Sequence, residues 1–372
     1  MAKLLMITGL GSAEDITSGK KGAFYNTLEE FHKYWERIDV VVPHVKNPVK
    51  NIFGNVFIHS SPFPLFFHPV FFVYKILKIN KKVNFDLMTV QEFPPFYNGI
   101  GAWVVSVLTK IPYVLEIHHI SGHPKAGNIK EKIYKKLMRL FIRFDVTRAK
   151  AVRVVNQKET PDFLLKAGVP LEKIVYIPSA YIDLSVFSPM GLSKKYDLIF
   201  VGRLVQNKGV GLLLETINKL KNEIFNLKLI IVGDGPLDNE LKSKIKNLKL
   251  QNNTIMYGRA KDSSEIARLI NESKILVMPS YNEGGPRVVL EAMACGVPIL
   301  ATPVGIVPDL LKNGLGGEVI AWRSEDIAQK VLGLLNDRER YLKYSLAGVE
   351  KARQFERKES IKNYAEKLLN II

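Results

Sequence analysis

The chain has 372 residues, of which 47% are hydrophobic and 24% are charged, so it is long enough for two domains and its composition excludes a largely disordered protein. The 53 basic and 36 acidic residues give a net charge of +17, which favours a polyanionic partner such as nucleic acid, anionic lipid or a phosphorylated substrate. The single cysteine, Cys295, excludes an internal disulfide, and with no export signal at the first residues we expect a cytoplasmic protein.

The first half of the chain alternates short β-branched runs with helical patterns, which is typical of parallel α/β architecture. The following linker, residues 183–195, contains Ser188-Pro189 and Gly191 and has no periodicity. Strands are predicted over residues 4–8, 37–42, 55–59, 87–90, 113–117 and 151–155.

Two segments of the first half are rich in aromatic or basic residues. Residues 62–79 are apolar and contain five phenylalanines, but prolines and lysines interrupt them, so no spanning helix is predicted. Residues 125–150 carry nine basic residues and place Ile129, Ile133, Leu140 and Phe144 on one helical face. Two interpretations are open: this face packs into the domain core, or it contacts an anionic membrane together with the aromatic segment.

The second half repeats the alternation, with strands predicted over residues 198–202, 229–233, 254–257, 275–278 and 298–301. Amphipathic helices follow the first two strands, and a last helix from Ser360 places Ile361, Tyr364 and Leu368 on one face. We therefore predict two doubly wound, Rossmann-like α/β domains facing a cleft. They comprise residues 1–182, completed by the C-terminal helix 356–372, and residues 183–355.

Ligands of open parallel sheets bind at the carboxyl ends of the strands, so the loops that follow the strands carry the chemistry. After the strand 275–278 comes Glu283-Gly284-Gly285, then a helix that opens at Pro286, contains Glu291 and closes at Gly296. The helix start offers free N–H groups, and both carboxylates can accept hydrogen bonds from sugar hydroxyls. Two solvated glutamates are the alternative, but the apolar neighbours of Glu291 argue against it.

The loops after the strands 198–202 and 229–233 suit a nucleoside diphosphate. Arg203 and Lys208 are spaced to hold two phosphates, although a basic surface loop is the simpler alternative. Gly233-Asp234-Gly235 allows close approach of a ring or a ribose.

Taken together, Gly202-Arg203 with Lys208-Gly209, residues 232–236, and residues 279–298 with Glu283 and Glu291 resemble the group 1 (family 4) glycosyltransferases of GT-B fold. The resemblance is strong over residues 150–320 and weaker before them. Departures from the family pattern are Gly285-Pro286 after Glu283-Gly284, residues 178–183 at the hinge, and a separated glycine pair near residue 20.

The resemblance implies a role for each matching residue. Arg203 and Lys208 hold the donor pyrophosphate, Glu291 binds the ribose, and Glu283 holds the sugar. His118, with His119 as an adjacent rival, is implied near the sugar as an orienting hydrogen-bond partner. The remaining positions are the donor loops Gly202, Gly233, Asp234, Gly235, Gly284 and Gly285, and an acceptor or phosphate loop with Gly19 and Gly22.

The implied reaction is metal-independent, retaining transfer of a hexosyl group from a UDP- or GDP-sugar to a glycan or lipid-linked acceptor. No metal-binding motif or other cofactor is expected, because fixed cations stabilise the leaving diphosphate. The alternatives are a nucleotide-sugar epimerase of the same architecture and a non-catalytic polyanion-binding protein. Nucleic acid is not expected, since acidic groups in a binding groove repel phosphate, and a dehydrogenase is disfavoured by incomplete dinucleotide fingerprints.

Overall fold

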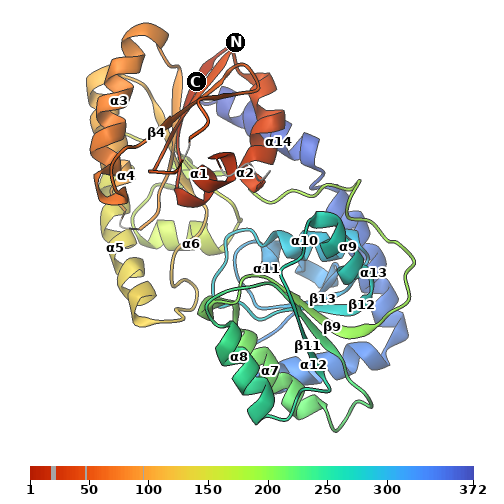
Figure 1. The fold of residues 1–372 in the computed structure, drawn as a ribbon. Helices are drawn as coiled ribbons and strands as arrows, with labels where there is room; N and C mark the ends of the chain where they lie inside the picture. The colour runs from red at the N-terminus through yellow and green to blue at the C-terminus, as the bar shows by residue number, and fades with distance from the viewer. Residues whose placement is uncertain (18–21, 47, 95) are drawn as a thin grey trace. The chain divides into compact units, whose positions relative to one another are not determined.

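The computed structural model describes residues 1–17, 22–46, 48–94 and 96–372 (Figure 1). The chain forms two compact units. Unit 1 comprises Met1–Ile120, Lys132–Ser179 and Lys358–Ile372, and unit 2 comprises Ser121–Glu131 and Ala180–Arg357. Compared with the predicted first domain of residues 1–182 and 356–372, residues 121–131, 180–182 and 356–357 group with unit 2 instead.

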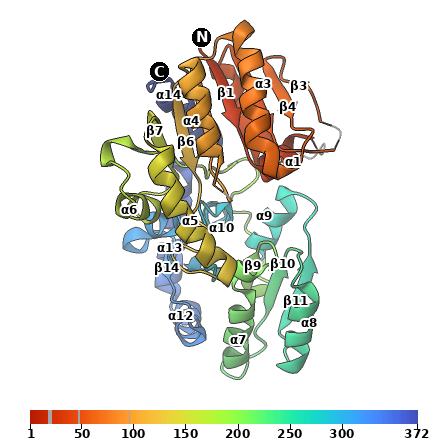
Figure 2. The ribbon, with the colours of Figure 1, turned by 90° about the vertical axis from the view of Figure 1, so that its left-hand side faces the viewer.

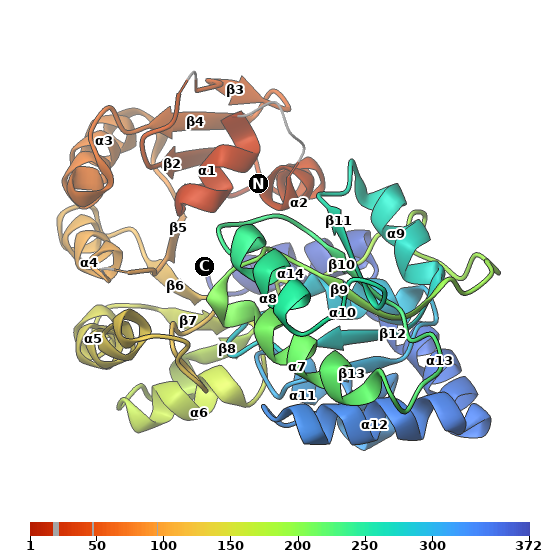
Figure 3. The same cartoon turned by 60° about the horizontal axis from the view of Figure 1, so that its bottom comes forward.

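Unit 1 is built on an eight-stranded sheet in the order β3-β4-β2-β1-β5-β6-β7-β8, and all of these strands except β1 are labelled in Figure 3. All neighbouring strands are parallel except β3 and β4. The six predicted strands are present, whereas the short edge strands β3 and β8 were not predicted. The strands are β1 (Lys3–Ile7), β2 (Arg37–Val42), β3 (Asn51–Ile52), β4 (Val56–Ser60), β5 (Leu87–Gln91), β6 (Tyr113–Ile117), β7 (Ala151–Val154) and β8 (Ile174–Tyr176).

Helices cover both faces of this sheet. Phe72, Val105 and Ile142, from α3, α4 and α5, share one hydrophobic core with alternate residues of the strands. On the other face Phe31 of α2 stacks on Tyr364 of α14, with ring centroids 4.7 Å apart. The helices are α1 (Leu10–Thr17), α2 (Ala23–Phe31), α3 (His68–Val83), α4 (Asn98–Thr109), α5 (Ile129–Asp145), α6 (Glu159–Lys166) and α14 (Arg357–Leu369).

Unit 2 contains a parallel six-stranded sheet in the order β11-β10-β9-β12-β13-β14. Its five predicted strands are present, and only the three-residue edge strand β14 was not predicted. The strands are β9 (Tyr196–Val201), β10 (Leu229–Val232), β11 (Thr254–Gly258), β12 (Ser273–Met278), β13 (Ile299–Ala301) and β14 (Gly317–Val319).

Two hydrophobic cores lie on the two faces of the unit 2 sheet. Successive strand residues alternate between them: Leu198 and Phe200 pack with α7, α8 and α12, while Ile199 packs with α9 and α10. This arrangement is the doubly wound fold expected from the sequence. The helices are α7 (Val210–Leu220), α8 (Asp238–Asn247), α9 (Ser263–Asn271), α10 (Arg287–Ala294), α11 (Val307–Leu310), α12 (Ser324–Asn336) and α13 (Arg338–Arg353).

The structure tests the interpretation that the predicted apolar face of the basic helix α5 packs into the domain core. The predicted apolar face is not its core face, because Ile133, Leu140 and Phe144 are 52%, 67% and 43% exposed. Met138 and Ile142 are buried instead and form the contact with the core. The core-face interpretation of the predicted stripe is therefore wrong.

Helices α3, α4 and α5 lie side by side on one face of the unit 1 sheet (Figure 2). No helix of the described ranges is long and apolar enough to cross a membrane. In the segment 62–79, residues 65–67 form a short 3-10 turn, and residues 68–79 belong to α3.

Candidate functional site

Three of the loops singled out in the sequence follow β9, β10 and β12 of unit 2. These strands are neighbours in the order β10-β9-β12, and all run parallel. Their carboxyl ends therefore meet at one edge of the sheet, where ligands of open α/β sheets bind.

The loops after β9 and β10 are joined through their backbones. The N–H of Leu204 donates to the carbonyl of Asp234 over 2.8 Å. Gly233 adopts a φ of +143°, and a Cβ atom there would lie 1.9 Å from the carbonyl oxygen of Gly202. Only glycine permits this approach. The loops that carry Arg203 and Asp234 are consequently fixed relative to each other before any ligand arrives.

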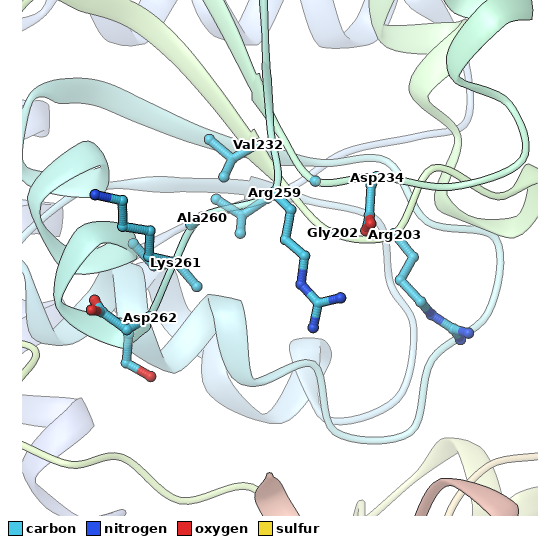
Figure 4. Close-up of a pocket in the computed structure, with 12 residues that line it drawn as sticks. Gly202, Arg203, Val232, Asp234, Arg259, Ala260, Lys261 and Asp262 are labelled. Atoms are coloured by element: carbon cyan, nitrogen blue, oxygen red, sulfur yellow. The ribbon is translucent and has the colours of Figure 1, made fainter. Parts of the chain in front are cut away.

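A cavity of about 400 Å³ opens beside these two loops (Figure 4). Gly202, Arg203, Gly233 and Asp234, all singled out in the sequence, line it together. The opposite side is formed by residues that the sequence analysis missed, from the loop after β11 and the start of α9: Arg259, Ala260, Lys261, Asp262, Ser263 and Ile266.

Arg259 is the most consequential of the missed residues, because its guanidinium extends into the space between Arg203 and Asp262 (Figure 4). The signal for it was present in the sequence. A strand was predicted over residues 254–257, and the rule that ligands bind after strands applies equally to the loop that begins at Gly258.

The loops after β9 and β12 are joined by both backbone and side chains. The N–H of Tyr281 donates to the carbonyl of Asn207 over 2.7 Å. One residue after Asn207 and two residues after Tyr281, the ammonium of Lys208 forms an ion pair with the carboxylate of Glu283. The side chains of Lys208 and Glu283 are 21% and 13% exposed, so the pair remains open to solvent. The structure thus brings together a predicted phosphate ligand and the predicted sugar ligand.

The Gly284-Gly285 turn leads into α10, which begins at Arg287 with Pro286 as its N-cap. The carbonyl of Gly284 accepts a hydrogen bond from the N–H of Ile306 over 3.0 Å, which anchors the turn. Gly235 lies in the loop after β10 and packs against the backbone of Leu204.

Glu291 projects from the second turn of α10 and is half-buried. Burial raises the pKa of Glu291, and the charge of Arg287 opposes this effect. A carboxyl group that loses hydration in this way gains from any hydroxyl that can hydrogen-bond to it.

Two of the predicted site residues, His118 and Gly22, belong to unit 1. His118 follows β6, and its Nε2 atom lies 3.8 Å from the Oε2 atom of Glu116. Gly22 is the extended N-cap residue of α2. Gly19 lies outside the described residues.

Within the part of the chain that the structure describes, no group of three or more His, Cys, Asp or Glu side chains is arranged to hold a metal ion. Cys295 is buried and reduced, and burial raises the pKa of its thiol to about 12.

The two doubly wound parallel sheets, one in each unit, have the GT-B architecture predicted from the sequence. Residues 188–352 match the family model described as "Glycosyl transferases group 1". The prediction of this family, its fold and its enzymatic class from the sequence is confirmed.

Curated relatives and solved structures agree with this assignment. An uncharacterized glycosyltransferase of Methanocaldococcus jannaschii is 28% identical over 336 residues, covering 82% of this chain and 87% of the relative. The N-acetyl-alpha-D-glucosaminyl L-malate synthase of Bacillus anthracis is 23% identical over 318 residues, covering 78% of this chain and 77% of the relative.

Among solved structures, the sucrose-phosphate synthase of Thermosynechococcus elongatus is similar with a TM-score of 0.82 at 17% sequence identity, covering 100% of this chain and 98% of the other. The Anabaena protein HepE, solved in complex with UDP and glucose, has a TM-score of 0.76 at 19% identity, covering 100% of both chains. At these identities the structural similarity concerns the fold.

Proposed function

We propose that the protein transfers a hexosyl group from a UDP- or GDP-sugar to an acceptor hydroxyl, with retention of anomeric configuration and without a metal ion. One observation carries the proposal. A cavity lined by Arg203 and Arg259 adjoins a loop frame in which Lys208 and Glu283 already pair. HepE has been solved with UDP and UDP-glucose, which supports a nucleotide-sugar donor for a chain of the same fold.

The proposed chemistry depends on fixed positive charge. When the bond from sugar to phosphate breaks, negative charge develops on the leaving diphosphate, and cations already in place stabilise this transition state. Arg203 offers a planar fork to one phosphate, whereas Lys208 offers a point charge to the other. Glu283, released from Lys208 by the incoming phosphate, accepts hydrogen bonds from the sugar, and Glu291 accepts them from the ribose.

Two further roles follow from the family resemblance. His118 orients the donor sugar through a hydrogen bond. The acceptor attacks on the face from which the diphosphate leaves, and a phosphate oxygen takes its proton, because no carboxylate is assigned as a nucleophile.

The donor proposal is tested by calorimetric titration with UDP and GDP. Arg203→Ala and Glu291→Ala should each weaken the preferred diphosphate at least about tenfold, the value of one charged hydrogen bond. Arg353→Ala is the matched control, because Arg353 lies on α13 with a side chain 64% exposed and pairs with Glu350. Unchanged affinity in both site variants would overturn the proposal.

A turnover assay with the preferred nucleotide sugar separates the reaction from its alternatives. A transferase releases free sugar from donor alone only slowly, and chelation of metals should leave its rate unchanged. Accumulation of an epimeric nucleotide sugar in the absence of an acceptor would instead identify an epimerase.

We also propose that the protein works at the cytoplasmic face of an anionic membrane, on a lipid-linked or membrane-bound glycan acceptor. The exposed apolar stripe of α5 lies among the basic residues of the segment 125–150. In the aromatic segment 62–79, Phe63, Phe66 and Phe67 are each more than half exposed. From residue 40 to residue 85 the sequence contains no acidic residue and six lysines: Lys46, Lys50, Lys75, Lys78, Lys81 and Lys82. Apolar side chains bordered by positive charge suit an anionic bilayer.

Co-sedimentation with phosphatidylglycerol vesicles tests the membrane proposal, with phosphatidylcholine vesicles as the neutral reference. Reversing the charge of Lys132, Lys135, Lys136 and Arg139, or changing Phe66 and Phe67 to serine, should abolish binding. Phe225→Ser is the matched control, since Phe225 is 99% exposed but belongs to unit 2. A parent protein that never sediments with the anionic vesicles would refute this part of the proposal.

A further inference from the structure

Strand β6 carries a buried acidic residue, Glu116, two positions before His118. Its neighbours Leu115 and Ile117 belong to the core shared with α4 and α5. Because successive side chains of a strand point to opposite faces, Glu116 points to the other face, where the C-terminal helix α14 packs. Glu116 is only 1% exposed.

The carboxylate of Glu116 is held by a fully buried network. Its Oε1 atom accepts hydrogen bonds from Nη1 of Arg153 over 2.7 Å and from the hydroxyl of Tyr364 over 2.5 Å. Arg153 is also its register partner on β7, and the guanidinium lies 3.8 Å from the ring centroid of Tyr364. Arg153 in turn donates to the carbonyls of Ile177 and Pro178.

This network keeps Glu116 charged. Burial alone raises the pKa of a carboxyl group, but the charge of Arg153 and the hydrogen bonds from neighbouring side chains outweigh burial and lower the pKa of Glu116 to about 2. The Oε1 atom is occupied by Arg153 and Tyr364, so the negative charge on Oε2 faces the imidazole of His118.

One ring nitrogen of His118, Nε2, faces the carboxylate of Glu116. Nε2 is buried and, among the described residues, has no hydrogen-bond partner. It lies 3.8 Å from Oε2 of Glu116, although the side chain as a whole is 38% exposed. The distance is longer than a hydrogen bond, but such contacts commonly tighten when substrate binds. The exposed part of the side chain therefore does not include Nε2.

We propose that Glu116 is a positioning residue that fixes the tautomer of His118. The carboxylate keeps the proton on Nε2, so Nδ1 is left unprotonated and can accept a hydrogen bond from a hydroxyl of the donor sugar. Tyr364 makes the C-terminal helix α14 part of this arrangement. The inference rests on the proposed role of His118 in donor binding.

Nitrogen-15 NMR of the full chain labelled at histidine tests the inference directly. The signals of His118 are those lost in His118→Gln. In the parent protein we expect the tautomer protonated on Nε2, with the Nδ1-protonated form scarcely populated. In Glu116→Gln the share of the Nδ1-protonated form should rise about fivefold or more, the equivalent of one hydrogen bond to a charged group.

A second variant covers the case in which Glu116→Gln leaves Arg153 unpaired and does not fold. Glu116→Met with Arg153→Met removes both charges together and should show the same tautomer shift. Tyr113→Phe is the control, because Tyr113 is another fully buried tyrosine of unit 1 whose hydroxyl bonds to the carbonyl of Asp145. It should leave the signals of His118 unchanged.

Two results would overturn the inference: an Nδ1-protonated His118 in the parent protein, or a tautomer share that is the same in the parent and in the variants of Glu116. Titration of the same samples with UDP and GDP reports on unit 2 separately. If the parent protein binds neither UDP nor GDP, the proposed function is refuted. If the variants of Glu116 leave the tautomer of His118 unaltered, only the role of Glu116 is refuted.

Discussion

In unit 2, charged side chains at the carboxyl end of the sheet stay partly exposed: Lys208 and Glu283 form a pair that is 21% and 13% exposed. In unit 1, Glu116, Arg153 and Asp145 are at most 3% exposed. An exposed pair can exchange one partner for a substrate at little cost in hydration, whereas a buried charge cannot reach a ligand. The buried charges can therefore act only on their neighbours and on stability.

The two units also differ in what holds these groups. The loops of unit 2 are joined by main-chain hydrogen bonds, such as Leu204 to Asp234 and Tyr281 to Asn207. The network of unit 1 is made by side chains from β6, β7 and α14. We therefore expect the unit 2 site to be sensitive to backbone conformation and the unit 1 cluster to be sensitive to charge.

The largest effect is expected from Gly233→Ala, which disturbs the close backbone contact between the loops after β9 and β10. The new Cβ would meet the carbonyl oxygen of Gly202 at 1.9 Å in a backbone region that L-residues rarely adopt. The strain and overpacking should cost about 2–4 kcal/mol. Differential scanning fluorimetry should show a lower Tm, and UDP or GDP affinity should fall with it.

Gly258→Ala is the matched control for this change. Gly258 also has a positive φ, +80°, but a Cβ there would find no atom within 4 Å. Only the conformational cost of about 1 kcal/mol is expected. Equal losses in the two variants would show that the close contact between the loops after β9 and β10 is unimportant for stability.

The same contrast explains what could be predicted from the sequence. The loops of unit 2 were recognisable because each places its functional residues within a few positions after a strand, as with Arg203 and Lys208. The loop with Arg259 follows the same rule and could have been found by it. The pairs of Glu116 with Arg153 and with Tyr364 join residues 37 and 248 positions apart, and no local pattern connects them.

Helix α5 shows a second limit of sequence patterns. Two apolar stripes run along it, one through Met138 and Ile142 and one through Ile133 and Leu140. Periodicity predicts a helix from either stripe. Which of them enters the core depends on the neighbouring strands, so burial could not be assigned from the helix alone.

The next effect concerns the exposed pair. Lys208→Met should lower kcat with the preferred nucleotide sugar about 100-fold, as expected when one donor that stabilises developing charge is removed. Thermal stability should change little, because a partly exposed ion pair contributes at most about 1 kcal/mol. Steady-state kinetics and a melting curve on the same sample provide both values.

Lys244→Met is the control for Lys208. Lys244 forms a comparable ion pair with Glu215 over 2.6 Å in the same unit, outside the site loops. Its loss should leave kcat unchanged. A fall in kcat of less than about threefold in Lys208→Met would remove Lys208 from the proposed chemistry.

The smallest expected effect is a pH dependence of the free energy of unfolding, which the buried acidic groups of unit 1 cause. Asp145 ends α5, and its two carboxyl oxygens have no hydrogen-bond partner among the described residues. Burial raises the pKa of Asp145 to about 8, and burial together with the charge of Asp145 raises the pKa of the neighbouring Glu92. Between about pH 4 and pH 8 the folded protein therefore holds a proton that the unfolded chain has released, so the free energy of unfolding falls as pH rises through this window.

Asp145→Asn should flatten this decline, because an amide does not ionise and its neutrality also lowers the pKa of Glu92. From pH 5 to pH 8, the free energy of unfolding of the variant should rise by at least about 1 kcal/mol relative to that of the parent. The reason is that one unit of pKa shift is equivalent to about 1.4 kcal/mol. Urea unfolding of both proteins across this range measures the difference. The opposite slope, or parallel curves, would mean that Asp145 ionises freely in the folded state. The contrast between an exposed, exchangeable pair in unit 2 and buried, constrained charges in unit 1 would then apply only to the cluster around Glu116.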